Sequence, residues 1–155
     1  MAKKLGQPLP ALNPLLVPAE WHRYLYCSIL LPWETSLKQR KNYRRFNSKN
    51  LIAGITLCKK GSAEEVAQDL ERYTRGPRKS SSLTFHGSDA ALKDLLRLLR
   101  NCVAHGHYAQ SDRIRIHFKH LHHGKLNLFG TLCFSELKAL VTYIQDDKEL
   151  STANP

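Results

Sequence analysis

The stretch LLRNCVAHGHY, residues 98–108 of this 155-residue chain, closes the clearest predicted helix in the sequence. Ser88 is typical of an N-cap, Asp89 places an acid in the first turn, and Gly106 follows the last turn. Between these signals, apolar side chains recur at helical spacing at Leu92, Leu95, Leu99, Cys102 and Val103. The pattern predicts an amphipathic helix over residues 89–105.

Arg100 and His105 are the residues of this stretch best suited to chemistry. At about 100° per residue, they lie on opposite shoulders of the apolar face, about 140° apart. Asn101 lies on the same side as His105, one turn earlier. One straight helix therefore brings Arg100 and His105 together poorly. Two such helices packed across a two-fold axis would bring the arginine of one beside the histidine of the other.

Downstream of this helix, the period of the apolar residues changes. They alternate with polar residues over 113–119, which predicts a strand with one apolar and one cationic face. A turn over 122–125 and a returning strand over 126–132 complete a predicted hairpin. Apolar residues at helical spacing over 134–148 then predict a final helix.

The first half of the chain gives weaker signals. Four prolines predict an extended leader over residues 1–18, and a helix follows over 19–31 until Pro32 ends or kinks it. The later segments are a predicted helix over 33–46, an ambiguous apolar segment over 51–60, a helix over 62–73 opened by a capping box, and a loop over 76–82.

Together these elements predict a mainly α fold, a helical bundle with a β-hairpin between its last two helices. We expect a single domain over residues 19–150. The leader at 1–18 precedes this domain, and a short tail at 151–155 follows it.

The net charge is the second strong signal. The chain has 24 Lys and Arg and 13 Asp and Glu, which gives a formal net charge of +11. No apolar run approaches the about 20 residues of a membrane span, and no secretory signal is visible at the N-terminus. The four cysteines form neither a Cys-x-x-Cys zinc pattern nor a dense disulfide framework. We therefore expect a cytoplasmic protein with no membrane partner, whose excess charge indicates a polyanion.

The basic residues gather in segment 38–49 and on the predicted strand 113–119. In the first of these, Tyr43 and Phe46 lie among the cations. Cations for phosphates and rings for bases are what a single-stranded nucleic-acid site uses, although a solvated helix face also carries such runs. The predicted RNA contacts are Lys38, Arg40, Lys41, Arg44, Arg45, Arg97, His107, Tyr108, Arg113, Arg115 and Lys119.

Arg100, Asn101 and His105, at the end of a late helix and followed by Gly106, resemble the signature of the HEPN superfamily (higher eukaryotes and prokaryotes nucleotide-binding), as found in its small prokaryotic members. The resemblance covers residues 88–150. It implies a HEPN-like bundle and a homodimer with a composite active site. It also implies metal-independent cleavage of RNA without a cofactor, in which the 2′-hydroxyl attacks the adjacent phosphate and leaves a 2′,3′-cyclic phosphate and a 5′-hydroxyl.

The resemblance also implies a role for each residue of the signature. Arg100 holds the phosphate and stabilises its developing charge, Asn101 orients the phosphate or the histidine, and His105 is the general base or acid. A defence or toxin role with an antitoxin protein as partner is implied as well. Some HEPN toxins are silenced by modification of a tyrosine two residues after the histidine. Here His107 holds that position and Tyr108 comes one residue later, which weakens the case for such a partner.

Three alternatives remain open from the sequence. A HEPN dimer without catalysis would bind RNA, a nucleotide or a protein through its basic face. A DNA-binding regulator is the second, although no helix-turn-helix signature stands out. The third is a metal site, because six of the eight histidines lie between residues 105 and 123. No known ligand pattern completes it, and we expect no functional metal.

Overall fold

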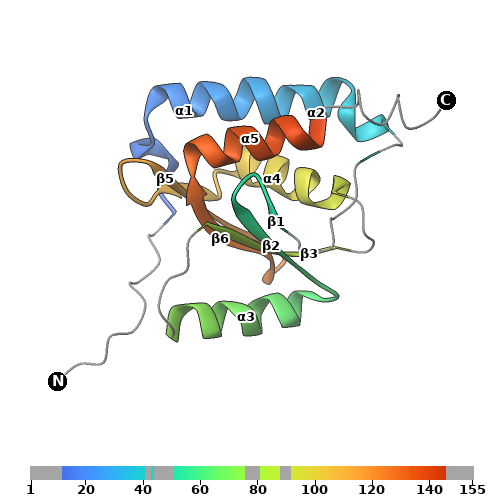
Figure 1. The fold of residues 1–155 in the computed structure, drawn as a ribbon, viewed down its shortest axis with the longest axis vertical. Coiled ribbons are helices and arrows are strands. Elements are labelled where there is room, and N and C mark those ends of the chain that lie inside the picture. The colour runs from blue at the N-terminus through green and yellow to red at the C-terminus, as the bar shows by residue number, and fades with distance from the viewer. Residues whose placement is uncertain (1–11, 41–42, 44–50, 76–80, 88–91, 146–155) are drawn as a thin grey trace.

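Six strands form one mixed sheet at the centre of the computed structural model, which describes residues 12–40, 43, 51–75, 81–87 and 92–145 (Figure 1). The strands are β1 (Leu51–Ile52), β2 (Ile55–Lys60), β3 (Ser82–His86), β4 (Tyr108–Gln110), β5 (Arg115–His122) and β6 (Lys125–Cys133). Their order across the sheet is β1-β2-β3-β6-β5-β4. β2 and β3 run parallel and are joined by the helix α3 (Ala63–Arg75), since parallel neighbours need a crossover, and the other neighbouring pairs are antiparallel.

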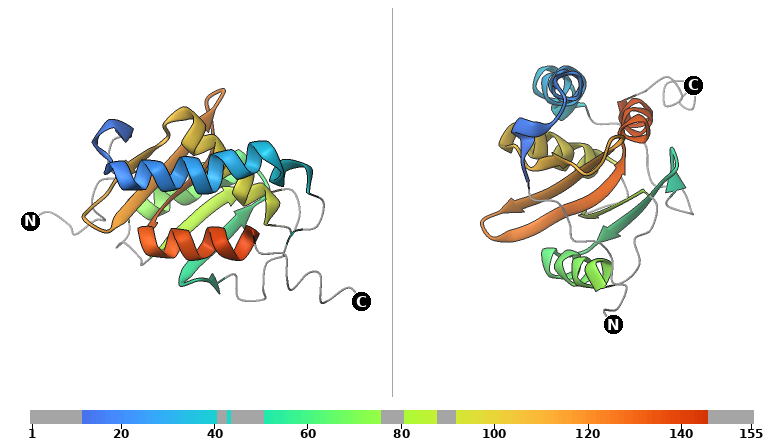
Figure 2. Two further views of the ribbon diagram at one scale, coloured as in Figure 1. Left: turned by 90° about the horizontal axis from the view of Figure 1, so that it is seen from above. Right: turned by 90° about the vertical axis from the view of Figure 1, so that its left-hand side faces the viewer.

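Helices cover both faces of this sheet. The remaining helical elements are η1 (Pro14–Leu16), α1 (Ala19–Tyr24), η2 (Leu25–Leu30), α2 (Leu31–Thr35), η3 (Leu37–Gln39), α4 (Lys93–His105) and α5 (Phe134–Gln145). α1, α2, α4 and α5 lie on one face, and α3 lies on the opposite face (Figures 1 and 2). The described chain therefore has three layers, with the sheet in the middle.

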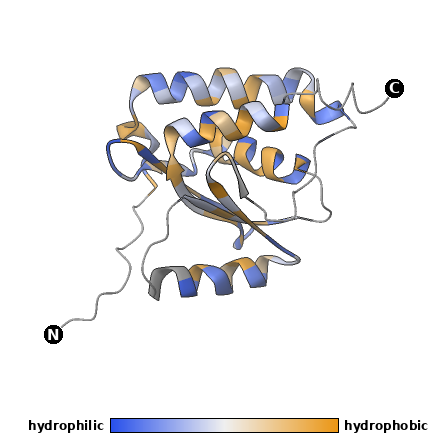
Figure 3. Cartoon of the chain, in the orientation of Figure 1, coloured by the Kyte–Doolittle hydropathy of each residue, from blue (hydrophilic) through white to orange (hydrophobic). Residues whose placement is uncertain are grey.

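Apolar side chains fill the space on both sides of the sheet. The larger cluster includes Leu95 and Leu99 of α4 and Phe118 of β5, all fully buried. A smaller cluster joins Val66 of α3 to Phe129 of β6 on the opposite face. Hydrophobic residues are concentrated in the sheet, α4 and α5, whereas α3 is mostly hydrophilic (Figure 3). The main core thus lies directly beneath α4, the helix that carries Arg100, Asn101 and His105.

The prediction of a mainly α bundle is wrong, because a six-stranded sheet forms the centre of the fold. The predicted hairpin exists as β5 and β6, but the ambiguous segment 51–60 forms β1 and β2, and the predicted loop runs into β3. β3 is paired on both sides and buried on both faces, although polar and apolar residues alternate along its sequence SLTFH. Its buried Thr84 is satisfied by a hydroxyl hydrogen bond of 2.8 Å to Asp69 of α3.

The first helix continues through Pro32, because the backbone stays helical at the junctions of α1, η2 and α2. Proline has no N–H for the carbonyl of Ser28 four residues earlier. Gln145 of α5 donates its Nε2 to that carbonyl instead, at 2.7 Å. The wider turns of the π-helical η2 accommodate the proline. α2 ends at Thr35 and the 3-10 turn η3 follows, so the predicted helix over 33–46 is confirmed for residues 33–35 and wrong for residues 36–40. Residues 41–42 and 44–46 lie outside the described residues.

The end of α4 confirms its sequence signal. Gly106 has a left-handed backbone (φ +69°) that favours glycine, and its N–H donates to the carbonyl of Val103. The N–H of His107 donates to the carbonyl of Cys102 at 2.8 Å, which completes a Schellman motif. This turn sends the chain directly into β4 and leaves His105 and His107 on either side of it. The predicted cap, Ser88, lies outside the described residues.

Candidate functional site

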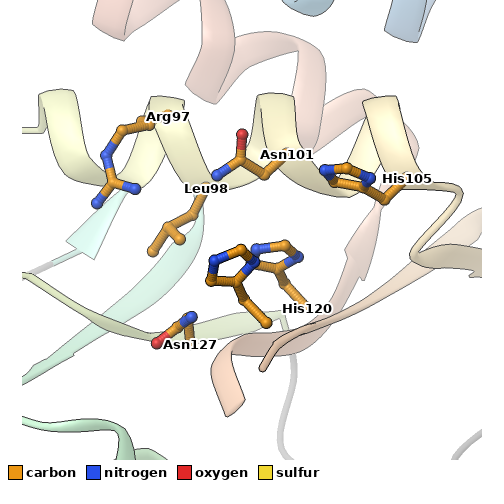
Figure 4. A pocket seen from close by; sticks show the side chains of 7 residues that line it. Arg97, Leu98, Asn101, His105, His120 and Asn127 are labelled. Carbon is orange, nitrogen blue, oxygen red and sulfur yellow. The ribbon is translucent and has the colours of Figure 1, made fainter. Parts of the chain in front are cut away.

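A polar pocket of about 230 Å³ lies between α4 and the ends of β5 and β6 (Figure 4). Figure 4 shows Arg97, Asn101 and His105 along α4, with His120 and Asn127 facing them from the sheet. The complete lining is Arg97, Leu98, Asn101, His105, His120, His122 and Asn127. Cationic, amide and imidazole groups therefore share one cavity, which suits an anionic ligand.

The α4 wall follows from helix geometry. Arg97, Asn101 and His105 are four residues apart, so they form one row along the helix. Apolar residues between them, including Leu99 and Val103, are buried in the core and fix the rotation of α4. The structure thus brings together the predicted Asn101 and His105. Arg97, predicted as an RNA contact, is their neighbour in this row.

Arg100 does not line this pocket. Its guanidinium forms a salt bridge with Glu34 of α2, and the hydrogen bond from Arg100 lowers the pKa of Glu34. The Nη1 of Arg100 also donates to Oδ1 of Asn101 at 2.9 Å. Because a guanidinium only donates, this bond assigns the oxygen of the amide. The amide nitrogen of Asn101 is then turned toward the pocket, where it is a hydrogen-bond donor (Figure 4).

His120, in the wall of the pocket, forms a pair with His107, which lies behind it. The Nδ1 atoms of His107 and His120 are 3.0 Å apart, so one ring donates and the other accepts. Burial, followed by the positive charge of nearby His105, lowers the pKa of His107. The pKa of His120 is lowered to about 4 by burial first and then by His107, His105, His122 and Arg97, in that order. Both rings are accordingly neutral at pH 7.

A β-bulge places Asn127 in the pocket. His120 pairs with Leu128 and Leu121 pairs with Leu126, so Asn127 is the extra residue of β6. Its side chain reaches the pocket beside His120. Neither residue is among the site residues predicted from the sequence, although His120 belongs to the histidine-rich segment 105–123. Alternation from Ile116 through Phe118 points to His120, but the predicted strand stopped at residue 119, and nothing in the sequence marks the bulge.

Tyr108 and Arg40 have structural partners. Tyr108 is 2 % exposed, its hydroxyl lies 2.8 Å from Nδ1 of His22, and burial raises the pKa of Tyr108 to about 12. Arg40 donates from Nη1 and Nη2 to the carbonyls of Gln145 and Ile144 at the end of α5. These contacts stabilise the fold, and the RNA-binding role of both residues stays a prediction.

The remaining predicted contacts are spread over the surface. Lys38 forms a salt bridge of 3.5 Å with Glu34, and Arg115 lies 4.0 Å from Asp112. Arg113 is exposed and Lys119 is half-buried. Lys41, Arg44 and Arg45 lie outside the described residues. Of the predicted RNA contacts, Arg97 therefore lines the pocket, and His107 lies directly behind it.

A family model described as HEPN pEK499 p136 matches residues 14–149. No curated protein and no solved structure matches the chain. Within the described ranges, no helix has the length and apolar character to cross a membrane. The same ranges contain no group of three or more His, Cys, Asp or Glu side chains arranged to hold a metal ion.

Proposed function

The chain belongs to the HEPN pEK499 p136 family, and from this premise we propose that it is a metal-independent endoribonuclease. The observation that carries the proposal is the row of Arg97, Asn101 and His105 on α4, which faces His120 across one pocket. This set combines an anion-binding group, a neutral donor and two imidazoles. It contains the groups that cleavage of a phosphodiester by a neighbouring hydroxyl requires.

The proposed reaction uses the 2′-hydroxyl of RNA as the nucleophile. Arg97 holds the scissile phosphate, and the amide nitrogen of Asn101 donates to an oxygen that gains charge in the transition state. His105 transfers a proton during the reaction. The products are a 2′,3′-cyclic phosphate and a 5′-hydroxyl. The excess of positive charge over the chain as a whole attracts the RNA strand.

The first test uses RNA carrying a single 2′-deoxy nucleotide. We expect the purified protein to cleave ordinary RNA in the presence of EDTA and to leave cyclic-phosphate ends, identified by mass spectrometry. The same RNA with a 2′-deoxy nucleotide at the cleaved position should stay intact there, because it lacks the nucleophile. Salt-dependent RNA binding without any cleavage would instead support a catalytically inactive HEPN binding module.

Arg100 has two candidate roles in this proposal. In the homodimer that the family resemblance implies, it would reach the phosphate in a composite site across the two-fold axis. Within one chain, its hydrogen bond to Asn101 and its salt bridge to Glu34 support a positioning role instead. We favour the positioning role, because Arg100 is absent from the pocket lining and Asn101 belongs to it.

A double-mutant cycle separates the two roles of Arg100. If it acts through Asn101, Arg100→Ala and Asn101→Ala should each slow cleavage about 10-fold, and the double variant should be no slower than either single one. Cleavage rates at saturating RNA measure this, with circular dichroism as the control for folding. Additive losses, about 100-fold in the double variant, would favour direct contact of Arg100 with the phosphate.

A further inference from the structure

We propose that His120 is the general base of this pocket, the group that takes the proton from the 2′-hydroxyl, and that His107 is its positioning partner. The inference rests on the proposed ribonuclease activity and adds a second proton-transfer group to it. A single histidine cannot accept one proton and donate another in the same step. The reaction therefore gains from two such groups, and His105 and His120 line the pocket from opposite walls.

The pair geometry fixes which nitrogen of His120 is available. Its Nδ1 is 3.0 Å from Nδ1 of His107, and no other hydrogen bond of His120 is found within the described part of the chain. When Nδ1 of His120 carries the proton and donates to His107, its Nε2 keeps a lone pair. Since His120 is 2 % exposed, its ring is held in place by packing as well as by this bond.

The surroundings of His120 keep it neutral. His107 faces it from the β4 side, His105 and Arg97 face it from α4, and His122 lies on its own strand. All four are bases, and together with burial they favour the form of His120 that accepts a proton. This assigns the base role to His120, so the acid role falls to His105, which is exposed at the mouth of the pocket.

The step balances with these two groups alone. The 2′-oxygen bonds to phosphorus as its proton passes to Nε2 of His120, which becomes an imidazolium. The bond from phosphorus to the 5′-oxygen breaks, and that oxygen takes a proton from protonated His105. His107 accepts the Nδ1 proton of His120 in a hydrogen bond throughout this step and so keeps the ring in one orientation. Exchange with water then restores both histidines.

The test compares His120→Asn with His123→Asn. Asparagine keeps a polar group near the Nδ1 position of His120 but has no basic nitrogen, so cleavage should slow about 100-fold while RNA affinity stays within threefold. His123 is an exposed turn residue outside the pocket lining, and asparagine tolerates its positive φ of 51°. This control variant should cleave at the wild-type rate. Thermal unfolding of all variants checks that they are folded.

Two readouts separate catalysis from a structural role. The pH profile of kcat/KM for the wild type should fall on the acidic side near the pKa of His120, about 4. His107→Asn should move this fall to higher pH, because His107 no longer disfavours a proton on His120. RNA with sulfur in place of the 5′-oxygen has a leaving group that needs no acid. It should rescue His105→Asn but not His120→Asn.

The outcomes distinguish this inference from the proposed function. An active wild type together with an equally active His120→Asn variant would overturn the inference and leave the ribonuclease proposal standing. Rescue of His120→Asn by the sulfur substrate would overturn the base assignment, since it would make His120 the acid. A wild type that cleaves no RNA would overturn both.

Discussion

Cleavage of RNA by a His105→Asn variant is expected to be about 100-fold to 10,000-fold slower than by the wild type. His105 lines the pocket in the last turn of α4, in one row with Asn101 and Arg97. Its loss removes a proton-transfer group without touching the apolar face of the helix, because the side chain is exposed. The rate should therefore fall while the midpoint of thermal unfolding stays close to that of the wild type.

The matched control is again His123→Asn, which replaces an exposed histidine of the β5–β6 turn. The same pair tests the toxin role in cells, where expression of the wild type should arrest growth and expression of His105→Asn should not. RNA binding at fixed salt should survive in both variants. Equal cleavage by the two variants would show that His105 has no role in cleavage. Equal toxicity would show that any growth effect is independent of cleavage.

The largest expected effect on stability comes from Gly130→Ala. Gly130 of β6 pairs with Leu83 of β3, and a methyl group there would meet the carbonyl oxygen of Ser82 and lie 2.9 Å from Cα of Leu83. Both are backbone atoms of the central strand, so they cannot rotate away as a side chain would. We expect the free energy of unfolding to fall by about 3 kcal/mol, measured by urea denaturation.

Gly124→Ala is the control for this stability prediction. Gly124 has a positive φ of 75° in the β5–β6 turn, and no atom lies within 4 Å of the position that a methyl group would take. It therefore reports the backbone cost alone, about 1 kcal/mol. If Gly130→Ala were no more destabilising than Gly124→Ala, the close approach of β3 and β6 would be relieved by small shifts of the strands.

The elements that the sequence predicts best are local ones. α4, its end at Gly106, the β5–β6 hairpin and α5 each have a period or a cap that a short window contains. β2 and β3 pair with each other across the crossover helix α3. β3 alternates over only five residues and begins inside a run of serines that favours a loop, so a short window does not identify it. The mainly α prediction failed there, because the parallel pairing is a property of the tertiary structure.

Part of the site is likewise predictable from local sequence, and part depends on packing between distant elements. Helical geometry places Asn101 with His105 and Arg100 on the other shoulder, and the structure agrees with both positions. That Arg100 meets Glu34 cannot be read from the sequence, because the two residues lie 66 positions apart. His120 joins the pocket because β5 continues beyond the predicted strand. These partners come from packing between elements, which the spacing within one element does not show.

The bulge at Asn127 makes the pocket depend on a residue count as much as on residue types. With one residue fewer in β6, Leu128 and Leu126 would pair with β5 in an unbroken ladder, and the sheet would keep its order without a side chain at this point of the pocket wall. A one-residue gap at position 127 in an aligned relative would therefore identify a protein that keeps the fold but lacks this side chain in the pocket lining. Such a gap is visible in the gene alone, before any activity is measured.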